Sequence, residues 1–377
     1  MRFAIIETIV GAGGHEIEHD RQIINGLRQT GHVVELFVPE GAELKDSYGL
    51  QVKRLKGSGI SYAGAKGWRK LLLSCKRELN RLKWYKQVYA LSRSGNYDAI
   101  LFPMVTYRFL RSLNKSVLRR AVIPVLFGVI GVAEHELKSF AGEAKKLERY
   151  GNIRLVNFSV TGQKSGMNCP NLFSARMSLY IAATKSQHKV VAGSSLHLGF
   201  IGQYRREKDM AGFLQVFSEC SFNKKVKLTV QMAALNPKEK QELLEVENRF
   251  SGLDNVVFTW GKYYGEEWNA FVDGFDALVV PYANDRYKQN GSGVLLTALG
   301  AKKPVVIADS VWPELLSEYK FGVVYKTGDK QQLKIALEQL VNNWEKKIDG
   351  YCKEIARVTI DYSPENIAND IVRIARI

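Results

Sequence analysis

The chain has 377 residues, 46% of them hydrophobic and 24% charged, which is an ordinary globular composition but a longer chain than one core usually supports. Its formal net charge is +16, and the excess lies in residues 1–190, with 30 Lys and Arg against 14 Asp and Glu, whereas residues 191–377 hold 24 of each. The four cysteines form no CxxC pair, which excludes a disulfide framework or zinc cluster and fits a reducing cytosol. The longest uncharged apolar run, Ala121–Ala133, is too short for the about 20 residues that span a bilayer, and the N-terminus does not read as a signal peptide.

Strand-like and helix-like segments alternate along the whole chain, which predicts an α/β fold with parallel sheets. The first half opens with a strand at residues 2–9, a glycine-rich loop and a helix over His15–Gln29. Further strands are predicted at residues 33–39, 97–104, 121–130 and 152–160. A long basic helix is expected over 66–93, and the polar stretch Thr184–Ser195 is interpreted as a linker.

The second half repeats the alternation with six predicted strands, at residues 196–203, 225–232, 255–260, 276–282, 303–309 and 321–325. Six strands make a complete doubly wound domain. Ser363 is expected to cap a last helix whose first residue is Pro364, with three isoleucines on one face. We therefore predict domains at 1–190 and 191–362, followed by a helix at 363–377.

The predicted strand at 196–203 is followed by a basic loop, "GQYRREKDM". Ligands of open α/β sheets bind beyond the carboxyl ends of the strands. Gly202 would let a ligand approach the backbone closely, and Arg205 and Lys208 supply charge for a diphosphate. A solvated basic turn is the alternative reading of this loop taken alone.

A second helix start lies at the same predicted edge of the sheet. The strand at 276–282 ends at Tyr282, and the turn of Gly291, Ser292 and Gly293 then opens a helix. The first backbone N–H groups of a helix have no partner within it, and its dipole favours negative charge there. A simple helix cap would explain this turn alone, but the two loops together indicate an anionic nucleotide ligand.

These segments resemble the donor-binding half of the GT-B glycosyltransferases, in particular family four. The resemblance rests on "GFIGQYRREKDMAGFL", "VVFTWGKYYGEEWNAFVDGFDALVVPYAND" and "SGVLLTALGAKKPVVIAD". It implies two Rossmann-like domains facing each other across a cleft, with the last helix crossing back to the first domain. It implies the following donor-binding residues: Gly202, Arg205, Lys208, Gly261, Lys262, Tyr282, Gln289, Gly291, Ser292, Gly293, Val294 and Thr297.

The sequence departs from the family at two acidic positions. Gln289 stands where the family usually has its first carboxylate and Thr297 where it has the second, which normally binds the ribose. Thr297 can still form a hydrogen bond with a hydroxyl group. The sugar hydroxyls are then left to Gln289, Asn290 or the backbone.

The glycine-rich loop of the first domain, "GAGG", does not complete a GxGxxG pattern because Glu16 takes the third glycine position. A dinucleotide cofactor is therefore poorly supported. The loop resembles the one that borders the acceptor in the same glycosyltransferases. The resemblance implies these acceptor-side residues: Gly13, Gly14, His15, Glu16 and His19. We take His15, with Arg205 and Lys208, as a candidate catalytic residue.

Residues 15–19, "HEIEH", match the HExxH pattern of zinc hydrolases. Here the pattern lies at the start of a Rossmann-type helix, and Ile17, Ile24 and Leu27 are expected to form the buried face of that helix. We therefore expect both histidines to face the cleft or solvent. We predict no metal. The family's usual histidine after the fourth strand has no clear counterpart, because Phe127 and Gly128 stand near its place. His135 is a stand-in for it.

The basic helix 66–93 mixes lysines and arginines with leucines and aromatic residues, and residues 53–93 hold 12 basic residues and one acid. Such a helix can lie on an anionic membrane surface. Packing against the sheet explains its apolar side equally well. No nucleic-acid-binding module is present, so nucleic acid is not predicted as a partner.

We conclude from the sequence that the chain is a cytoplasmic glycosyltransferase on the inner face of the cell membrane. It would transfer a sugar from a nucleotide diphosphate donor to a saccharide or lipid-linked acceptor in surface polysaccharide synthesis. The resemblance implies retention of configuration and no cofactor or metal besides the donor. Two alternatives stay open: a nucleotide-sugar epimerase of the same architecture and a non-catalytic GT-B partner protein.

Overall fold

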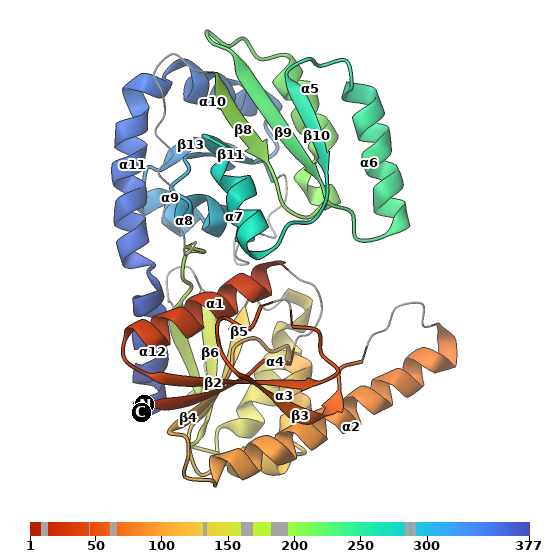
Figure 1. The fold of residues 1–377 in the computed structure, drawn as a ribbon, viewed down its shortest axis with the longest axis vertical. Helices are drawn as coiled ribbons and strands as arrows, with labels where there is room; N and C mark the ends of the chain where they lie inside the picture. Colours follow the sequence, from red (N-terminus) through yellow and green to blue (C-terminus); the bar gives the residue numbers. More distant parts are fainter. Residues whose placement is uncertain are drawn as a thin grey trace. The chain divides into compact units, whose positions relative to one another are not determined.

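A computed structural model of the chain describes residues 1–8, 14–44, 46–60, 66–130, 134–159, 169–181, 195–282, 287 and 292–377. They form two compact units, one made of Met1–Ser178 with Ser363–Ile377 and the other of Leu179–Tyr362. Figure 1 shows that each unit is a parallel sheet covered by helices. The division predicted at residue 190 and most of the predicted linker fall within residues 182–194, outside the described residues.

Within the described residues, the sheet of the first unit has seven parallel strands in the order β3-β2-β1-β4-β5-β6-β7. The strands are β1 (Arg2–Ile6), β2 (Val33–Glu40), β3 (Val52–Ser58), β4 (Ala99–Phe102), β5 (Val125–Ile130), β6 (Ile153–Ser159) and β7 (Leu172–Arg176). The central strands β1 and β4 are nearly continuous buried apolar runs, because helices cover both faces of the sheet.

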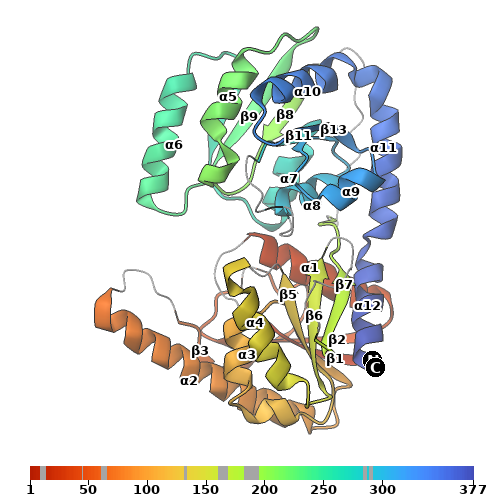
Figure 2. The same ribbon diagram turned by 180° about the vertical axis from the view of Figure 1, so that it is seen from behind.

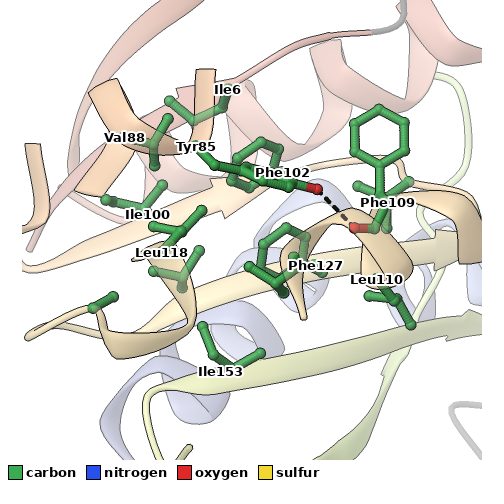
Figure 3. Packing of buried hydrophobic residues seen from close by; sticks show 14 of the residues in the cluster. Ile6, Tyr85, Val88, Ile100, Phe102, Phe109, Leu110, Leu118, Phe127 and Ile153 are labelled. Atoms are coloured by element: carbon green, nitrogen blue, oxygen red, sulfur yellow. Dashed lines mark hydrogen bonds between the residues drawn. The ribbon is translucent and has the colours of Figure 1, made fainter. Parts of the chain in front are cut away.

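Helices of the first unit cover the two faces of this sheet (Figure 2). They are α1 (Gly14–Gln29), α2 (Gly67–Ser92), α3 (Tyr107–Leu113), the 3-10 helix η1 (Val117–Arg120), α4 (Glu134–Leu147) and α12 (Pro364–Arg376). Residues of α2, α3 and α4 share one apolar core with the sheet. In Figure 3 the Tyr85 hydroxyl of α2 donates to the backbone carbonyl of Phe109 at 2.9 Å, beside the stacked rings of Phe102 and Phe127. This hydrogen bond allows the tyrosine to be fully buried.

The last helix packs in the first unit against α1, as expected. The Ser363 side chain accepts a hydrogen bond from the Asn366 amide at 3.4 Å, and Pro364 takes the first turn. A Cβ atom on Gly26 of α1 would lie 1.9 Å from the carbonyl oxygen of Pro364, so only glycine permits this approach. The predicted isoleucine face of α12 is buried in this contact.

The second unit contains, among its described residues, six parallel strands in the order β10-β9-β8-β11-β12-β13. The strands are β8 (Leu196–Phe200), β9 (Val226–Met232), β10 (Val256–Trp260), β11 (Ala277–Val280), β12 (Val305–Ala308) and β13 (Gly322–Tyr325). The helices are η2 (Arg206–Lys208), α5 (Met210–Ser218), α6 (Pro237–Phe250), α7 (Gly265–Asp273), α8 (Gly293–Gly300), α9 (Pro313–Glu318), α10 (Lys330–Asn342) and α11 (Trp344–Asp361).

All six strands predicted for the second half are present, whereas two strands of the first half were missed. The missed strands, β3 and β7, are the edges of the first sheet. In β3 only Leu55 is buried, so the run "VKRLKGS" resembles a solvated basic segment more than a strand. Edge strands have a partner on one side only, and their apolar pattern is correspondingly weaker.

Candidate active site

The strand order of the second unit indicates where a ligand binds. From β8 the chain moves outward to β9 and β10 and then returns to the other side of β8 at β11. The loops after β8 and β11 therefore diverge, and a crevice opens at the carboxyl ends of these two strands. Gly202 follows β8 and Tyr282 follows β11, so both loops selected from the sequence begin there.

Gly202, Lys208 and the first turn of α8 meet at this edge. Gly202 has a φ of +90°. A Cβ atom on it would lie 2.8 Å from Cγ2 of Val294 and 3.2 Å from Nζ of Lys208, so both the backbone angle and the contacts require glycine. The structure thus brings together the basic loop and the helix start, which are about ninety residues apart in the chain.

Lys208 is buried, with 4% of its surface exposed. Its Nζ donates to the backbone carbonyl of Ile201 at 3.3 Å and lies 5.5 Å from the centre of the Tyr282 ring. Burial, and after it the charge of Arg205, lowers the pKa of Lys208 to about 7. The sequence predicted that this lysine supplies charge for a diphosphate. In the structure its charge is marginal at neutral pH, and a neighbouring anion would restore it.

Arg205 is half-buried, and its guanidinium makes no hydrogen bond or ion pair with another described residue. The next residue differs, because Arg206 donates from Nε to Glu242 at 3.1 Å. Arg205 also lines a cavity of about 380 Å³ beside Gln203 and Tyr204. Its planar donor group is therefore available to an anion at this edge of the sheet.

The start of α8 presents backbone donors beside Lys208. Ser292 caps the helix: its Oγ accepts from the Leu295 amide at 3.2 Å and donates to the Tyr282 hydroxyl oxygen at 3.3 Å. Among the described residues, nothing accepts a hydrogen bond from the N–H groups of Gly293 and Val294. These two amides add the positive end of the helix dipole to the site.

Thr297 uses its proton inside α8, where its Oγ1 donates to the Gly293 carbonyl at 2.8 Å. The hydroxyl oxygen is therefore available only as a hydrogen-bond acceptor. Of the predicted interactions with ribose, Thr297 can accept a hydrogen bond from a ribose hydroxyl but cannot donate one. Gln289, Asn290 and Gly291, the other predicted residues of this loop, lie outside the described residues.

One residue of the site was missed by the sequence analysis. Gln231 of β9 is 2% exposed, its Oε1 accepts from the Gly202 amide at 2.7 Å, and its Nε2 donates to the Gly261 carbonyl at 3.0 Å. One amide thus joins the loop after β8 to the loop after β10, where Lys262 is exposed. A glutamine in the otherwise apolar end of this strand was the available signal, because a buried amide needs hydrogen-bond partners.

The equivalent strand end of the first unit is acidic. Glu7 follows β1 and Asp20 lies on α1, with 3% and 2% of their surfaces exposed. The two carboxyl groups share a hydrogen bond, and burial, then Glu7, then Glu16 raise the pKa of Asp20 well above its usual value. Asp20 therefore keeps a proton into a higher pH range than an exposed aspartate.

The prediction that His19 faces the cleft or solvent is wrong. His19 has no exposed surface, and its ring packs edge-on against Phe158 at 4.8 Å between ring centres. This contact packs the ring of His19 against β6 of the sheet. Ile17 is only partly buried, although Ile24 and Leu27 are buried as expected.

The other predicted residues of the first unit are only partly visible. Gly13 lies outside the described residues, as do the side chains of His15 and His135. Glu16 is partly buried. Within the described part of the chain, no three His, Cys, Asp or Glu residues are grouped as a metal site. Phe127 is a core residue, and a Cβ atom on Gly128 would lie 2.0 Å from the Pro103 carbonyl oxygen.

Residues 195–343 match the family described as Glycosyl transferases group 1. The match covers β8 to α10 and therefore the whole edge at which Gly202, Lys208 and Val294 meet. Residues 195–343 therefore form a group 1 glycosyltransferase domain. A search of curated protein sequences with this chain gives no match.

Solved structures show that the glycosyltransferase fold extends over both units. HepE from Anabaena, in complex with UDP and glucose, is similar with a TM-score of 0.68 and 15% identity over 99% of this chain and 98% of its own. Sucrose-phosphate synthase from Thermosynechococcus elongatus gives 0.67 and 14% identity over 100% and 98%. A UDP-forming α,α-trehalose-phosphate synthase from Burkholderia xenovorans gives 0.67 and 13% identity over 100% and 98%.

The geometry of this domain suits stabilisation of a leaving anion. Buried Lys208, the Arg205 guanidinium, which has no partner among the described residues, and two helix N–H groups lie at one edge of the sheet. Fixed donors that are shielded from solvent stabilise developing negative charge more than they would in water. Among the described residues, the acidic end of β1 in the first unit offers no comparable donors for a phosphate.

Proposed function

We propose that the enzyme transfers a sugar from a UDP-sugar to a saccharide or lipid-linked acceptor. One observation carries the proposal: Gly202, Lys208 and the first turn of α8 meet at the switch point of a group 1 glycosyltransferase domain. The UDP bound in HepE and the UDP-forming reaction of the trehalose-phosphate synthase support uridine as the donor base.

In this reaction the bond between the sugar and the diphosphate breaks as a bond to an acceptor oxygen forms. Negative charge grows on the departing diphosphate. Arg205 and protonated Lys208 neutralise that charge, and the N–H groups of Gly293 and Val294 donate to the phosphate oxygens. Removal of one such donor typically lowers kcat by about a hundredfold or more.

Further features of the proposal follow from the resemblance to family four. The sugar is a hexose, transfer proceeds with retention of configuration and without a metal ion, and the product belongs to a surface polysaccharide. Gly14, His15 and Glu16, with Gly13 before them, serve the acceptor, and His15 is their candidate catalytic side chain. Thr297 accepts a hydrogen bond from a ribose hydroxyl.

We further propose that the enzyme works in the cytoplasm, at the inner face of the cell membrane. The excess of 16 basic over acidic residues in 1–190 supports an anionic membrane surface as its partner. Among the described helices, none is long and apolar enough to cross a bilayer.

The test is a turnover assay with a panel of nucleotide sugars, with and without lipid and oligosaccharide fractions as acceptors. We expect release of UDP that depends on acceptor and falls at least about a hundredfold in Arg205→Ala. A new sugar nucleotide formed without acceptor would favour the epimerase. UDP-sugar binding without any turnover would favour the non-catalytic partner protein.

A further inference from the structure

The two faces of α2 differ in what they contact. Its buried face, which includes Trp84, Tyr85 and Val88, belongs to the core of the first unit. The opposite side of its first half is apolar but exposed, with relative exposures of 72% for Trp68, 67% for Leu71, 57% for Leu72 and 60% for Leu79. Together with exposed Cys75, these four residues form what we call the apolar stripe. Their spacing of three or four residues places them on one side of a helix.

Packing against the described residues of the chain does not account for the apolar stripe. Figures 1 and 2 both show the N-terminal part of α2 extending beyond the edge of the sheet of its own unit. Burial of the opposite face begins at Asn80 and continues to the end of the helix. The first half of α2 thus carries a continuous exposed apolar face, the kind of surface that marks an interaction site.

The charges around the apolar stripe are almost all positive. Residues 66–93 contain nine Lys and Arg and a single acid, Glu78. That acid is engaged inside the protein, where it accepts from Arg81 at 2.9 Å and from the Ser112 hydroxyl. Lys76, Lys83 and Lys86 are exposed and have no acidic partner among the described residues.

This combination selects among possible partners. A second copy of the chain would bring two strongly basic surfaces together, which opposes association. Nucleic acid would satisfy the lysines but leave the leucines in water. An anionic bilayer satisfies both, because leucines enter the acyl boundary, tryptophan lies at the headgroup level and lysines meet lipid phosphates.

We propose that the apolar stripe of α2 inserts into the headgroup region of an anionic bilayer, with the flanking lysines on the lipid phosphates. This inference rests on the proposed membrane partner and deepens it, because it assigns docking to residues 68–79 rather than to basic charge alone. It also commits the enzyme to a lipid-anchored acceptor, since a docked enzyme meets its substrate at the bilayer surface.

The experiment is co-sedimentation of the full chain with vesicles of phosphatidylcholine and phosphatidylglycerol in equal parts, and with pure phosphatidylcholine. We expect binding to the anionic vesicles to be at least about tenfold stronger and to weaken as salt is raised. The stripe variant Leu71→Ser/Leu72→Ser/Leu79→Ser should lose at least about tenfold in affinity at constant charge. A charge variant, Lys76→Gln/Lys83→Gln/Lys86→Gln, should lose affinity and part of the salt dependence.

A matched control is Val33→Ser/Val122→Ser, which removes exposed apolar side chains of the same unit outside α2. It should bind vesicles as the wild type does. Tryptophan emission should shift to the blue on anionic vesicles, and Trp68→Phe should remove the shift. A thermal-shift measurement with UDP is made on each variant. An unchanged melting temperature and an unchanged shift with UDP show that the variant is folded and that its donor site is intact, whatever its binding to vesicles.

Two results would overturn the docking proposal while leaving the proposed transferase untouched. Unchanged vesicle binding by the stripe variant would show that charge alone docks the protein. Absence of vesicle binding by the wild type, together with self-association that the stripe variant abolishes, would show that the stripe joins two copies of the chain.

Discussion

The first strand of each unit ends in a different chemical setting. In the second unit β8 leads to Gly202 and the buried Lys208, with Arg205 nearby. In the first unit β1 leads to Glu7, which shares a hydrogen bond with buried Asp20. Both are the first strands of sheets whose first six strands have the same order, although the first sheet has a seventh strand, and both lie next to a switch point. The same backbone plan therefore carries opposite charges at equivalent places.

This difference indicates a division of labour. A diphosphate gains from a buried ammonium group and from helix N–H groups, whereas a buried carboxyl pair repels it. An uncharged hydroxyl-bearing acceptor meets no such repulsion at the acidic end. The comparison thus supports the second unit as the donor side.

The largest expected effect comes from Gly202→Ala. Its φ of +90° and a Cβ only 2.8 Å from Val294 combine backbone strain with a clash inside the site. We expect a loss of about 1 kcal/mol from strain and at least about a hundredfold weaker UDP binding. Gly328→Ala is the control, because Gly328 has a φ of +80° and open space around it. Calorimetry showing equal UDP affinity in both variants would contradict the close approach.

Asp20→Asn tests the acidic end. The usual pKa of this carboxyl is 3.8 and burial with Glu7 raises it in the folded state, so the folded chain binds more protons than the unfolded chain above pH 4. The contribution of Asp20 to the stability of the wild type should therefore fall as pH rises above 4. The asparagine removes that penalty and should stabilise the protein by about 1–2 kcal/mol at pH 7, with no gain near pH 3.

Urea unfolding at several pH values measures this difference, and exposed Asp254→Asn serves as the control with little effect. If Asp20→Asn destabilises the protein equally at all pH values, the buried carboxyl pair does not titrate as described.

Gln231→Met should weaken the connection between the loop after β8 and the loop after β10. Both of its side-chain hydrogen bonds are lost while its volume is kept. If these loops bind the donor before reaction, as proposed, KM for the UDP-sugar should rise about tenfold with a smaller change in kcat. Thr229→Val on the same strand removes a buried hydrogen bond to His197, and should lower stability without changing KM. Equal KM in both variants would assign Gln231 a purely structural role.

The pH dependence of donor binding gives the smallest expected effect. Because the pKa of Lys208 is about 7 in the free protein, UDP-glucose must draw a proton onto it above that pH. Affinity should be level below pH 7 and fall by at most about tenfold per unit above it. UDP-glucose is the suitable probe because its diphosphate has no group that titrates near neutrality. Lys208→Arg should flatten the profile, and a sloping profile in that variant would place the titration elsewhere.

The sequence predicted the second unit well because its strands are buried apolar runs separated by loops with distinctive chemistry. It missed β3 because a charged edge strand has the same pattern as a solvated segment. The convergence of Gly202 with Val294 followed from the rule that parallel strands end at one edge. The burial of Lys208 and its lowered pKa did not follow, because they depend on tertiary neighbours such as Tyr282.

The error over His19 has a related cause. A histidine at a polar helical position resembles a surface residue, and only the aromatic ring of Phe158 from β6 shows that this side of α1 is also packed. Gln231 was missed for a different reason. A glutamine in an apolar strand indicates that it has buried hydrogen-bond partners, but the side-chain pattern does not show that these partners are backbone atoms of Gly202 and Gly261.

The most direct test of the account is calorimetric titration of UDP into Lys208→Met and Lys303→Met. Both lysines are 4% exposed and each donates to a backbone carbonyl, but Lys303 precedes β12 at the opposite edge of the same sheet. We expect the Lys208 variant to lose UDP binding by at least about a hundredfold and the Lys303 variant to bind UDP as the wild type does. Undiminished UDP binding by Lys208→Met would contradict a diphosphate site at the carboxyl end of β8.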